Sequence, residues 1–306
     1  MLKAANHIRS RHVLTASLAL VLAIASTFAQ NGNPTAPARL PEVTVTDRAP
    51  ADSIPEEQRV GPNQQPEWTT ERRFATTRIY VLPPWQVEFE QWWKGQYPRH
   101  DKGNHLFQSE LGVGLPYRLQ LDLYENLERT TRGTFQHQGV QVEMRYALAD
   151  WGKIPLNPTL YGEWKFNDDE PDAYEVKLLL GEEIAPRWHW GFNVFYEQEV
   201  GRGRTSEIGF AQAVSYSVVD GKLSVGLEMN LERSSGPNFD GKPAVEFLLG
   251  PSLQWRPHPR VHLDLVPLFG TTHDSPAVEA YVVFGIDFGP AKSRSEGLVP
   301  ASTQTR

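Results

Sequence analysis

The stretch WGFNVFYEQEV, Trp190 to Val200, carries a regular alternation of side chains. Apolar or aromatic residues stand at every second position, namely Trp190, Phe192, Val194 and Tyr196. The positions between them include Gly191, Asn193 and Glu197. A β-strand projects successive side chains to opposite faces, so this pattern predicts a strand with one apolar and one polar face. The fold depends on whether the apolar face contacts a protein core or lipid.

Similar stretches recur between residues 74 and 289, without helical periodicity between them. They exceed the length of about five or six residues that is common for globular strands. They match the roughly 9–11 residues that a tilted strand needs to cross a bilayer. About twelve can be recognised, at 85–94, 105–113, 117–128, 135–148, 159–167, 173–184, 187–199, 205–218, 222–233, 244–256, 260–269 and 277–288.

The connections between these stretches alternate in length. Short turns are expected at 114–116, 185–186, 220–221 and 257–259, and longer polar loops such as KGQYPRHDKGN and RSSGPNFDGK lie between them. One connection, ADWGKIPLNP, is long where a short turn is expected. Tight turns at one end and long loops at the other are typical of outer-membrane barrels. The sequence therefore predicts an all-β fold, an antiparallel up-and-down transmembrane β-barrel of about 12 strands.

Aromatic residues on the apolar faces are expected to form two rings. In the predicted topology one ring contains Trp85, Tyr117, Tyr146, Trp188, Tyr216 and Trp255. The other contains Trp93, Phe107, Phe166, Tyr174, Tyr196 and Phe269. Trp and Tyr favour the interface between membrane and water, so we interpret Trp85, Trp93, Tyr117, Tyr146, Trp188, Tyr196, Tyr216 and Trp255 as a membrane girdle. A soluble lipocalin-like barrel or a two-sheet sandwich would alternate equally well and is the alternative.

If the apolar faces meet lipid, the polar faces line the lumen. The candidate lumen-lining residues are Glu88, Glu90, Glu110, Arg118, Asp122, Glu143, Arg145, Glu163, Lys165, Glu228, Glu246 and Asp264, with Glu175, Lys177, Glu197 and Glu232 on the same faces. Acidic residues outnumber basic ones, and an acidic lumen favours cations. The alternative is that opposed charges such as Glu143 and Arg145 cross-link neighbouring strands and close the barrel.

No chemical motif indicates an enzyme. The chain has no cysteine, and its nine histidines are scattered. His189 and His262 each lack a second ligand at a zinc spacing, so we expect neither a metal site nor a cofactor. A formal net charge of −7 gives no reason to expect nucleic acid as a partner.

The two ends of the chain differ from the middle. A basic start, the apolar run VLTASLALVLAIASTFA and the small residues Thr27 and Ala29 predict a secretory signal peptide over 1–29. An uncleaved anchor is the alternative, although the run is short for a span of roughly 20 residues. Residues 30–73 are rich in Pro, Asn, Gln and charge and predict a disordered periplasmic arm, with the barrel over 74–289 and a disordered tail over 290–306. We expect an outer-membrane location in a Gram-negative-type bacterium.

Three stretches resemble known families. TTRIYVLPPWQVEFEQWW, residues 76–93, resembles the first strand of uncharacterised bacterial outer-membrane barrels, transporter-like proteins of the phenol-degradation meta-pathway type. VEAYVVFGIDF, ending at Phe288, is similar to the signal that outer-membrane assembly machinery reads, although the chain continues beyond it. LPEVTVTD, residues 40–47, resembles the energy-coupling box of TonB-dependent transporters, but this chain is too short for their plug and larger barrel, so we interpret it as a linker.

The barrel architecture also resembles outer-membrane phospholipase A. The H-x-S-N-G motif of that family is absent here, and HLFQSE is the nearest stretch. We therefore expect a passive channel or transporter for small solutes, with membrane lipid and the assembly machinery as partners. A non-conducting structural or ligand-binding barrel, closed by salt bridges or by the arm, and a soluble periplasmic β protein are the alternatives.

Overall fold

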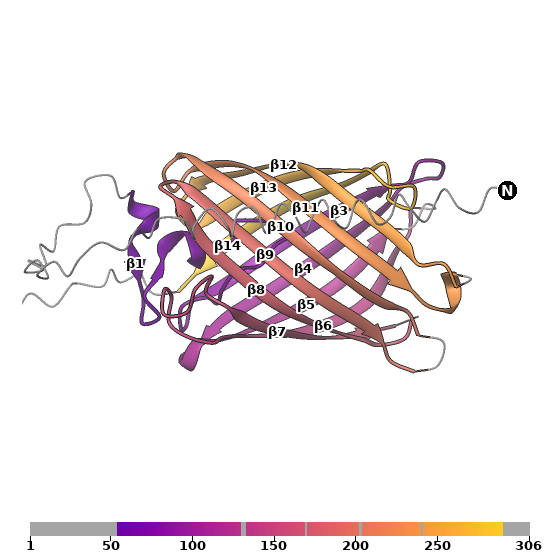
Figure 1. The fold of residues 1–306 in the computed structure, drawn as a ribbon, viewed down its shortest axis with the longest axis horizontal. Coiled ribbons are helices and arrows are strands. Elements are labelled where there is room, and N and C mark those ends of the chain that lie inside the picture. Colours follow the sequence, from indigo (N-terminus) through magenta and orange to yellow (C-terminus); the bar gives the residue numbers. More distant parts are fainter. Residues whose placement is uncertain (1–53, 130–132, 169, 202–203, 240, 290–306) are drawn as a thin grey trace, which may run out of the picture. The chain divides into compact units, whose positions relative to one another are not determined.

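A computed structural model describes residues 54–129, 133–168, 170–201, 204–239 and 241–289. The predicted signal peptide and the predicted tail lie outside these residues. In the described part, twelve strands form one closed barrel (Figure 1). They are β3 (Val87–Tyr97), β4 (Asn104–Leu115), β5 (Leu119–Arg129), β6 (Phe135–Ala147), β7 (Thr159–Asn167), β8 (Ala173–Ala185), β9 (Trp188–Glu199), β10 (Ser206–Val219), β11 (Leu223–Ser235), β12 (Ala244–His258), β13 (Val261–Gly270) and β14 (Val278–Phe288).

Each strand pairs antiparallel with the next one in the chain, and β14 pairs with β3 to close the barrel. The closing register runs from Val278 opposite Tyr97 to Phe288 opposite Val87. The prediction of about twelve antiparallel up-and-down strands is confirmed, and a two-sheet sandwich is excluded. The wall begins at β3, so residues 74–86 do not belong to it.

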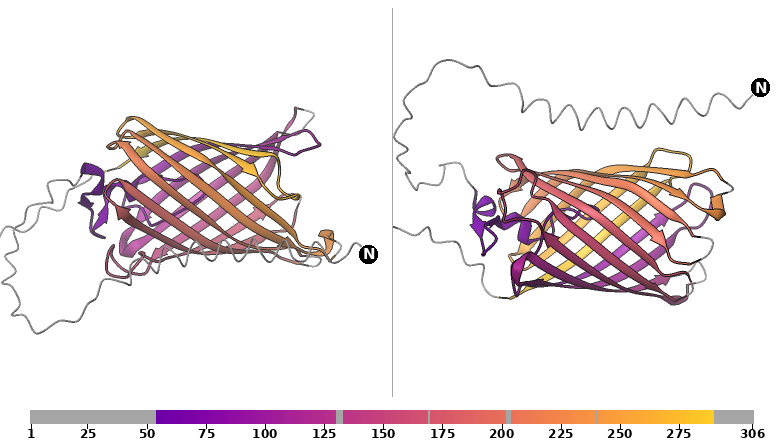
Figure 2. Two further views of the ribbon diagram at one scale, coloured as in Figure 1. Left: turned by 45° about the horizontal axis from the view of Figure 1, so that its top comes forward. Right: turned by 60° about the horizontal axis from the view of Figure 1, so that its bottom comes forward.

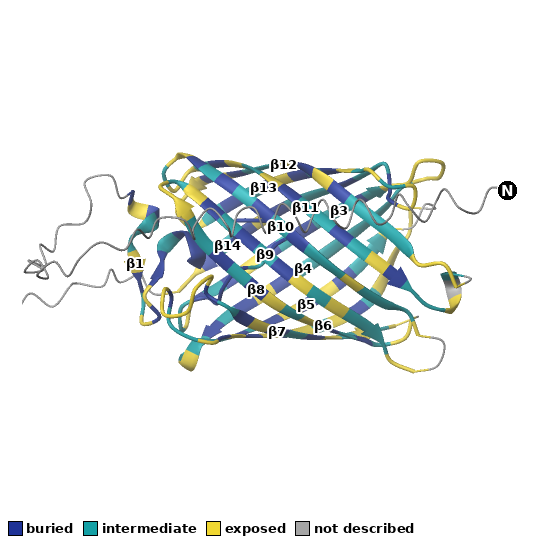
Figure 3. Cartoon of the chain, in the orientation of Figure 1, coloured by how far each residue is buried: buried dark blue, intermediate teal, exposed yellow. Residues whose placement is uncertain are grey.

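Many apolar side chains of the wall point away from the barrel axis, in agreement with the orientation expected from the sequence, although Trp92, Leu248, Val266, Leu268 and Val283 form a buried cluster with Ala75. Leu227 on β11 is 53% exposed, whereas the next residue, Glu228, is 1% exposed. Figure 3 shows the same alternation of buried and exposed residues along the strands. Polar residues inside and apolar residues outside are the reverse of a soluble barrel.

A segment N-terminal to the wall lies inside part of the lumen. Residues 54–86, here called the inner segment, contain the short 3-10 helices η1 (Pro55–Glu57) and η2 (Glu67–Thr70) and the short strands β1 (Arg59–Val60) and β2 (Gln65–Pro66). Extended chain then runs into the barrel and returns to the start of β3. Figure 2 shows the indigo elements of this segment at one end of the barrel.

The inner segment corrects the prediction of a disordered arm over 30–73. Residues 54–73 are folded, and residues 30–53 lie outside the described part of the chain. Trp68 is 0% exposed, and Phe74, Ile79, Tyr80 and Val81 are buried in the same cluster. The composition of 30–73 suggested too little apolar surface for a core, but the barrel supplies the other side of this core.

The unexpectedly long connection ADWGKIPLNP, between β6 and β7, covers the inner segment. Trp151 packs edge-on against Trp68 and Tyr80, with ring centroids 5.7 Å and 5.2 Å away. The Trp151 backbone N–H donates to the Asn63 carbonyl at 2.9 Å, and the Tyr80 hydroxyl donates to the Ala149 carbonyl at 2.7 Å. A two-residue turn could not provide these contacts.

A glycine in the wall allows the returning chain to pass close by. A Cβ atom at Gly114 would lie 2.0 Å from the Pro83 carbonyl oxygen and 2.7 Å from that of Leu82. The Gly114 N–H also donates to the Gln86 carbonyl at 2.9 Å. The inner segment and β4 are therefore in direct backbone contact.

We predict that Gly114→Ala destabilises the folded protein by about 1–3 kcal/mol, because the added methyl group forces the backbones of two segments apart. Urea unfolding in detergent micelles measures the change. Gly162→Ala is the matched control, since a Cβ there meets nothing within 4 Å. Equal stability of the two variants would contradict the close approach at Gly114.

Candidate functional site

The inner segment is held in the lumen mainly by arginines. Arg72 Nε donates to both oxygens of Glu90, at 2.5 and 2.7 Å, and its Nη2 donates to Glu110 at 3.1 and 3.3 Å. The guanidinium also lies 4.4 Å from the centroid of Trp92. All three charged side chains are at most 1% exposed. One arginine therefore bridges two buried carboxylates of neighbouring strands.

Arg78 adds a second cation at the same place. Its Nη2 donates to the two oxygens of Glu110 at 2.7 and 2.8 Å and contacts the Tyr124 hydroxyl at 3.2 Å. Burial opposes the charge of Arg78, but Glu110 and the other acidic neighbours raise its pKa well above the ordinary value. This guanidinium is therefore charged throughout the physiological pH range.

Further contacts hold the segment on other sides. Glu228 on β11 accepts the Thr76 N–H at 2.8 Å and the Thr76 hydroxyl at 2.6 Å. Asn193 on β9 accepts the Arg78 N–H at 2.8 Å. Gln120 on β5 accepts the Leu82 N–H at 2.7 Å. The segment is thus bonded to the wall around the barrel, as an integral part of the fold.

The lumen also contains a cavity of about 400 Å³, here called the vestibule. Its floor includes Ala75, Thr76 and Arg78 of the inner segment. Its wall carries charged and aromatic side chains, among them Glu163, Lys165, Glu175, Lys177, Glu197, Glu207, Tyr161 and Phe195. A second cavity, of about 290 Å³, is lined mainly by polar residues of β3 to β7 and of the loop after β7.

Strand register aligns acidic residues along the inner wall. Each residue of the following series lies directly opposite the next one on the neighbouring strand, from β5 to β10: Asp122, Glu143, Glu163, Glu175, Glu197 and Glu207. We call this series the acidic row. Neighbouring strands lie about 4.7–4.9 Å apart, so successive carboxylates are close neighbours.

Basic residues neutralise the acidic row only in part. Arg145 lies 3.6 Å from Asp122 and also bonds to Glu143. Lys177 pairs with Glu175 at 2.9 Å.

At the vestibule end of the row, Lys165 pairs with Glu197 at 2.5 Å. Glu163 accepts only a hydroxyl, from Tyr161 at 2.8 Å, among the hydrogen bonds of the described residues. Like charges directly opposite one another destabilise a sheet, so the neighbouring carboxylates of the row favour either protonation or a bound cation.

The structure places most of the candidate lumen residues on the inner wall. Glu90, Glu110 and Glu228 bind the inner segment, Asp122, Glu143, Arg145, Glu163 and Lys165 belong to the acidic row or pair with it, and Glu88, Asp264 and Glu246 also face inward. Arg118 does not line the lumen. It lies in the 3-10 turn η3 (Pro116–Arg118), has a φ of 64° and pairs with Asp150 at 3.1 Å.

The candidate girdle residues lie toward the two ends of the wall. Trp188 and Tyr216 pack together at 5.0 Å at the end that holds the inner segment, and Trp93 stacks on His105 at 5.7 Å toward the other end. Trp85 and Tyr117 differ from the expectation, because they occupy turns with φ values of 69° and 64° rather than strands. The remaining candidates, Tyr146, Tyr196 and Trp255, are exposed on strands.

The inner segment was the part of the site that sequence reasoning missed. The sequence did contain a signal for it, namely three arginines, Arg72, Arg73 and Arg78, directly before strands with an excess of inward carboxylates. Arg73 pairs with Glu56 of the same segment at 3.1 Å. A basic stretch directly before an acidic barrel is a pattern that could have indicated the pairing.

No protein-family model and no curated protein matches the chain. Among solved structures, an outer membrane channel from Pseudomonas putida F1 is similar, with 9% identity over 71% of this chain and 100% of that chain and a TM-score of 0.53. The NanC porin matches 67% of this chain and 100% of its own, with 12% identity and a TM-score of 0.45. The KdgM porin has 9% identity and a TM-score of 0.43 over 67% and 99%. At these identities the likeness to the Pseudomonas channel supports the barrel fold alone.

We predict that Arg72→Met destabilises the protein by about 3–5 kcal/mol, because it leaves buried carboxylates without their cation. Urea unfolding followed by tryptophan fluorescence measures the loss. Arg59→Met is the matched control: Arg59 pairs with Glu183 at 3.1 Å but is 42% exposed, so its removal should cost less than about 1 kcal/mol. Similar losses in both variants would mean that the buried pairs do not hold the segment.

Proposed function

We propose that this protein is an outer-membrane channel for small solutes, that its lumen favours cations, and that the inner segment closes it in the state described here. The observation that carries the proposal is the acidic row, which leads along the wall from the vestibule toward the inner segment. A channel needs a wall that binds its solute weakly at several successive sites.

The outer-membrane location rests on the outer surface of the barrel. Its strands expose Leu, Val, Phe and Met, with Trp and Tyr toward the ends. A surface of this composition would be unstable in water and suits a bilayer. Residues 1–29 as an export signal, and recognition of the final strand by the assembly machinery, belong to this proposal.

The cation preference rests on unbalanced charge in the vestibule. Carboxylates on adjacent strands repel one another, and a cation that enters between them relieves this repulsion. Carboxylates concentrated inside a low-dielectric barrel also raise the local concentration of cations.

A small organic solute is the chemical class that the vestibule suits. Trp92, Tyr161 and Phe195 give its charged wall several aromatic faces. The resemblance of residues 76–93 to transporter-like barrels of the phenol-degradation meta-pathway type points in the same direction. Aromatic faces bind flat rings and organic cations.

A non-conducting barrel that binds a ligand in the vestibule is the second candidate. The extensive bonding of the inner segment favours it, because buried ion pairs are costly to break. The two candidates share the site and differ only in whether the segment can leave the lumen.

We predict that the protein sediments with outer membranes and requires detergent for extraction. Leu227→Arg, on the outward face of β11, should lower the yield of membrane-inserted protein, since an arginine facing the lipid core costs about 2–4 kcal/mol. Val200→Arg, directly after the end of β9, is the control with a smaller cost. Recovery of the wild type in the aqueous fraction would support the soluble alternative.

In planar bilayers we predict small or absent currents for the wild type and clear channel currents after deletion of residues 54–82, because the deletion opens the lumen. Reversal potentials in a KCl gradient should show cation preference in the open form. Glu163→Gln combined with Glu207→Gln should weaken that preference.

Glu125→Gln is the matched control for the charge change, because Glu125 is exposed and does not face the lumen. If the deletion variant inserts without current above the lipid background, the non-conducting candidate holds. Anion preference in the open form would contradict the role given to the acidic row.

A further inference from the structure

Because the last strand pairs with the first, a histidine near the C-terminal end of the wall lies next to two glutamates of its first strand. Glu88 and Glu90 lie on the inner face of β3, and His262 lies on β13. Gly285 of β14 stands between them, opposite His262 on one side and opposite Glu90 on the other. A Cβ atom at Gly285 would lie 1.9 Å from His262 Nε2, so only glycine allows the imidazole to lie across β14 and reach β3.

The distances among the three side chains suit a metal ion. His262 Nε2 lies 3.2 Å from Glu90 Oε1 and 3.9 Å from Glu88 Oε1, and one ligand atom of each residue lies within 4.8 Å of the others. Bonds of about 2.0–2.2 Å place the ligands of a tetrahedral ion roughly 3.3–3.5 Å apart. The distance between His262 and Glu90 is already close to this value. A small rotation of the Glu88 side chain would bring its distance from His262 into the same range.

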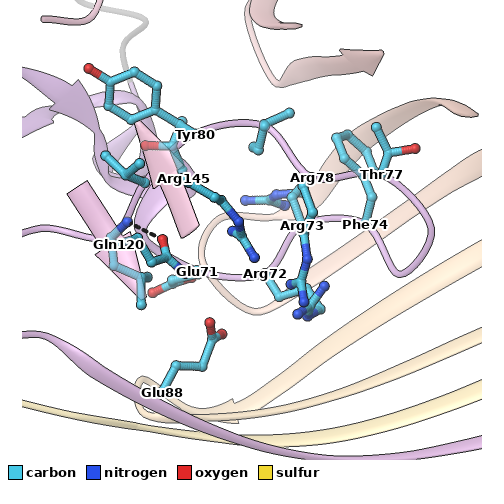
Figure 4. Close-up of a pocket in the computed structure, with 14 residues that line it drawn as sticks. Glu71, Arg72, Arg73, Phe74, Thr77, Arg78, Tyr80, Glu88, Gln120 and Arg145 are labelled. Atoms are coloured by element: carbon cyan, nitrogen blue, oxygen red, sulfur yellow. Dashed lines mark hydrogen bonds between the residues drawn. The ribbon is translucent and has the colours of Figure 1, made fainter. Parts of the chain in front are cut away.

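Two buried atoms at this place have no hydrogen-bond partner among the described residues. They are His262 Nε2 and Glu88 Oε1, in side chains that are 0% and 5% exposed. Buried polar atoms without partners are costly, and both atoms point to the same spot. In Figure 4 the Glu88 carboxylate points toward a cavity of about 30 Å³ that Arg72 and Arg145 also line, whereas Glu90 and His262 do not line it.

The surrounding groups orient the three ligands. His262 Nδ1 lies 3.0 Å from Asp264 Oδ2, an arrangement that fixes the ring and leaves Nε2 free to bind. Arg72 donates to both oxygens of Glu90, at 2.5 Å to Oε1 and 2.7 Å to Oε2, and the Trp92 ring N–H donates to Oε2 at 2.9 Å. A metal ion bound by Glu90 Oε1 would therefore share this oxygen with Arg72. Histidine bound to a metal commonly has a carboxylate in the position of Asp264.

We propose that Glu88, Glu90 and His262 bind one divalent transition-metal ion in the inner wall, with Asp264 as a positioning residue. One imidazole and two carboxylates suit ions such as Zn²⁺, Co²⁺ or Mn²⁺. The bound ion would join β3 to β13 across β14, next to the arginine that anchors the inner segment. The proposal is independent of solute passage, because it concerns binding to the folded chain alone.

The test uses the full chain in detergent micelles, treated with a chelator and then titrated with Co²⁺. We expect one Co²⁺ per chain after desalting, visible absorption bands of the protein-bound ion, and loss of these bands when Zn²⁺ is added. His262→Gln should abolish the bands. Asp264→Asn should weaken Co²⁺ binding about 10–100-fold, as is common when a residue behind a metal ligand is changed.

His189→Gln is the matched control, because His189 is also 0% exposed and its Nε2 lies 3.9 Å from a single carboxylate, that of Glu56. This variant should bind Co²⁺ like the wild type. A parallel sample refolded in the presence of Co²⁺ gives the ion access before the barrel closes. Absence of bound Co²⁺ in the folded wild type by both routes would overturn the proposal, whether or not the variants fold. Unchanged Co²⁺ binding in folded His262→Gln would also overturn the proposal. In that case His262 would be a protonated imidazole paired with the neighbouring carboxylates.

Discussion

The structure depends on the neutralisation of acidic side chains inside a closed barrel. Strands that expose apolar residues outward turn their charged residues inward, where Glu90 and Glu110 are almost completely buried. An uncompensated carboxylate in such a place is strongly unfavourable. Arg72 and Arg78 of the inner segment supply the missing positive charge. The acidity of the wall around Glu90 and Glu110 is therefore explained first by the segment that it holds.

The same constraint explains the aromatic contacts around the arginines. Arg72 lies over Trp92, which also donates a hydrogen bond to Glu90 at 2.9 Å. Trp68 and Trp151 close the segment on the side away from the vestibule. The aromatic side chains exclude water from the ion pairs. The buried charged groups in turn find their hydrogen-bond partners in one another.

The strands could be predicted from the sequence because their signal is local. Alternation with a period of two, as at Leu227 and Glu228, assigns each residue to a face without knowledge of its neighbours in space. The inner segment could not be predicted in this way, because Trp68 and Arg72 have their partners on distant strands. Arg118 and Tyr117 were misplaced for a related reason: they continue the alternation of β5 but have the positive φ angles of a turn. The acidic row and the grouping of Glu88 with His262 require the register and the closure of the barrel, which the order of residues does not contain.

The short connection between the inner segment and the wall has a kinetic consequence. Only a few residues, from Pro83 to Gln86, separate the part that fills the lumen from β3. A segment displaced from the barrel would remain tethered at its mouth, at an effective concentration far above that of a free peptide. Reinsertion would be an intramolecular event whose rate is independent of the protein concentration, so each barrel would return to its filled form without a partner.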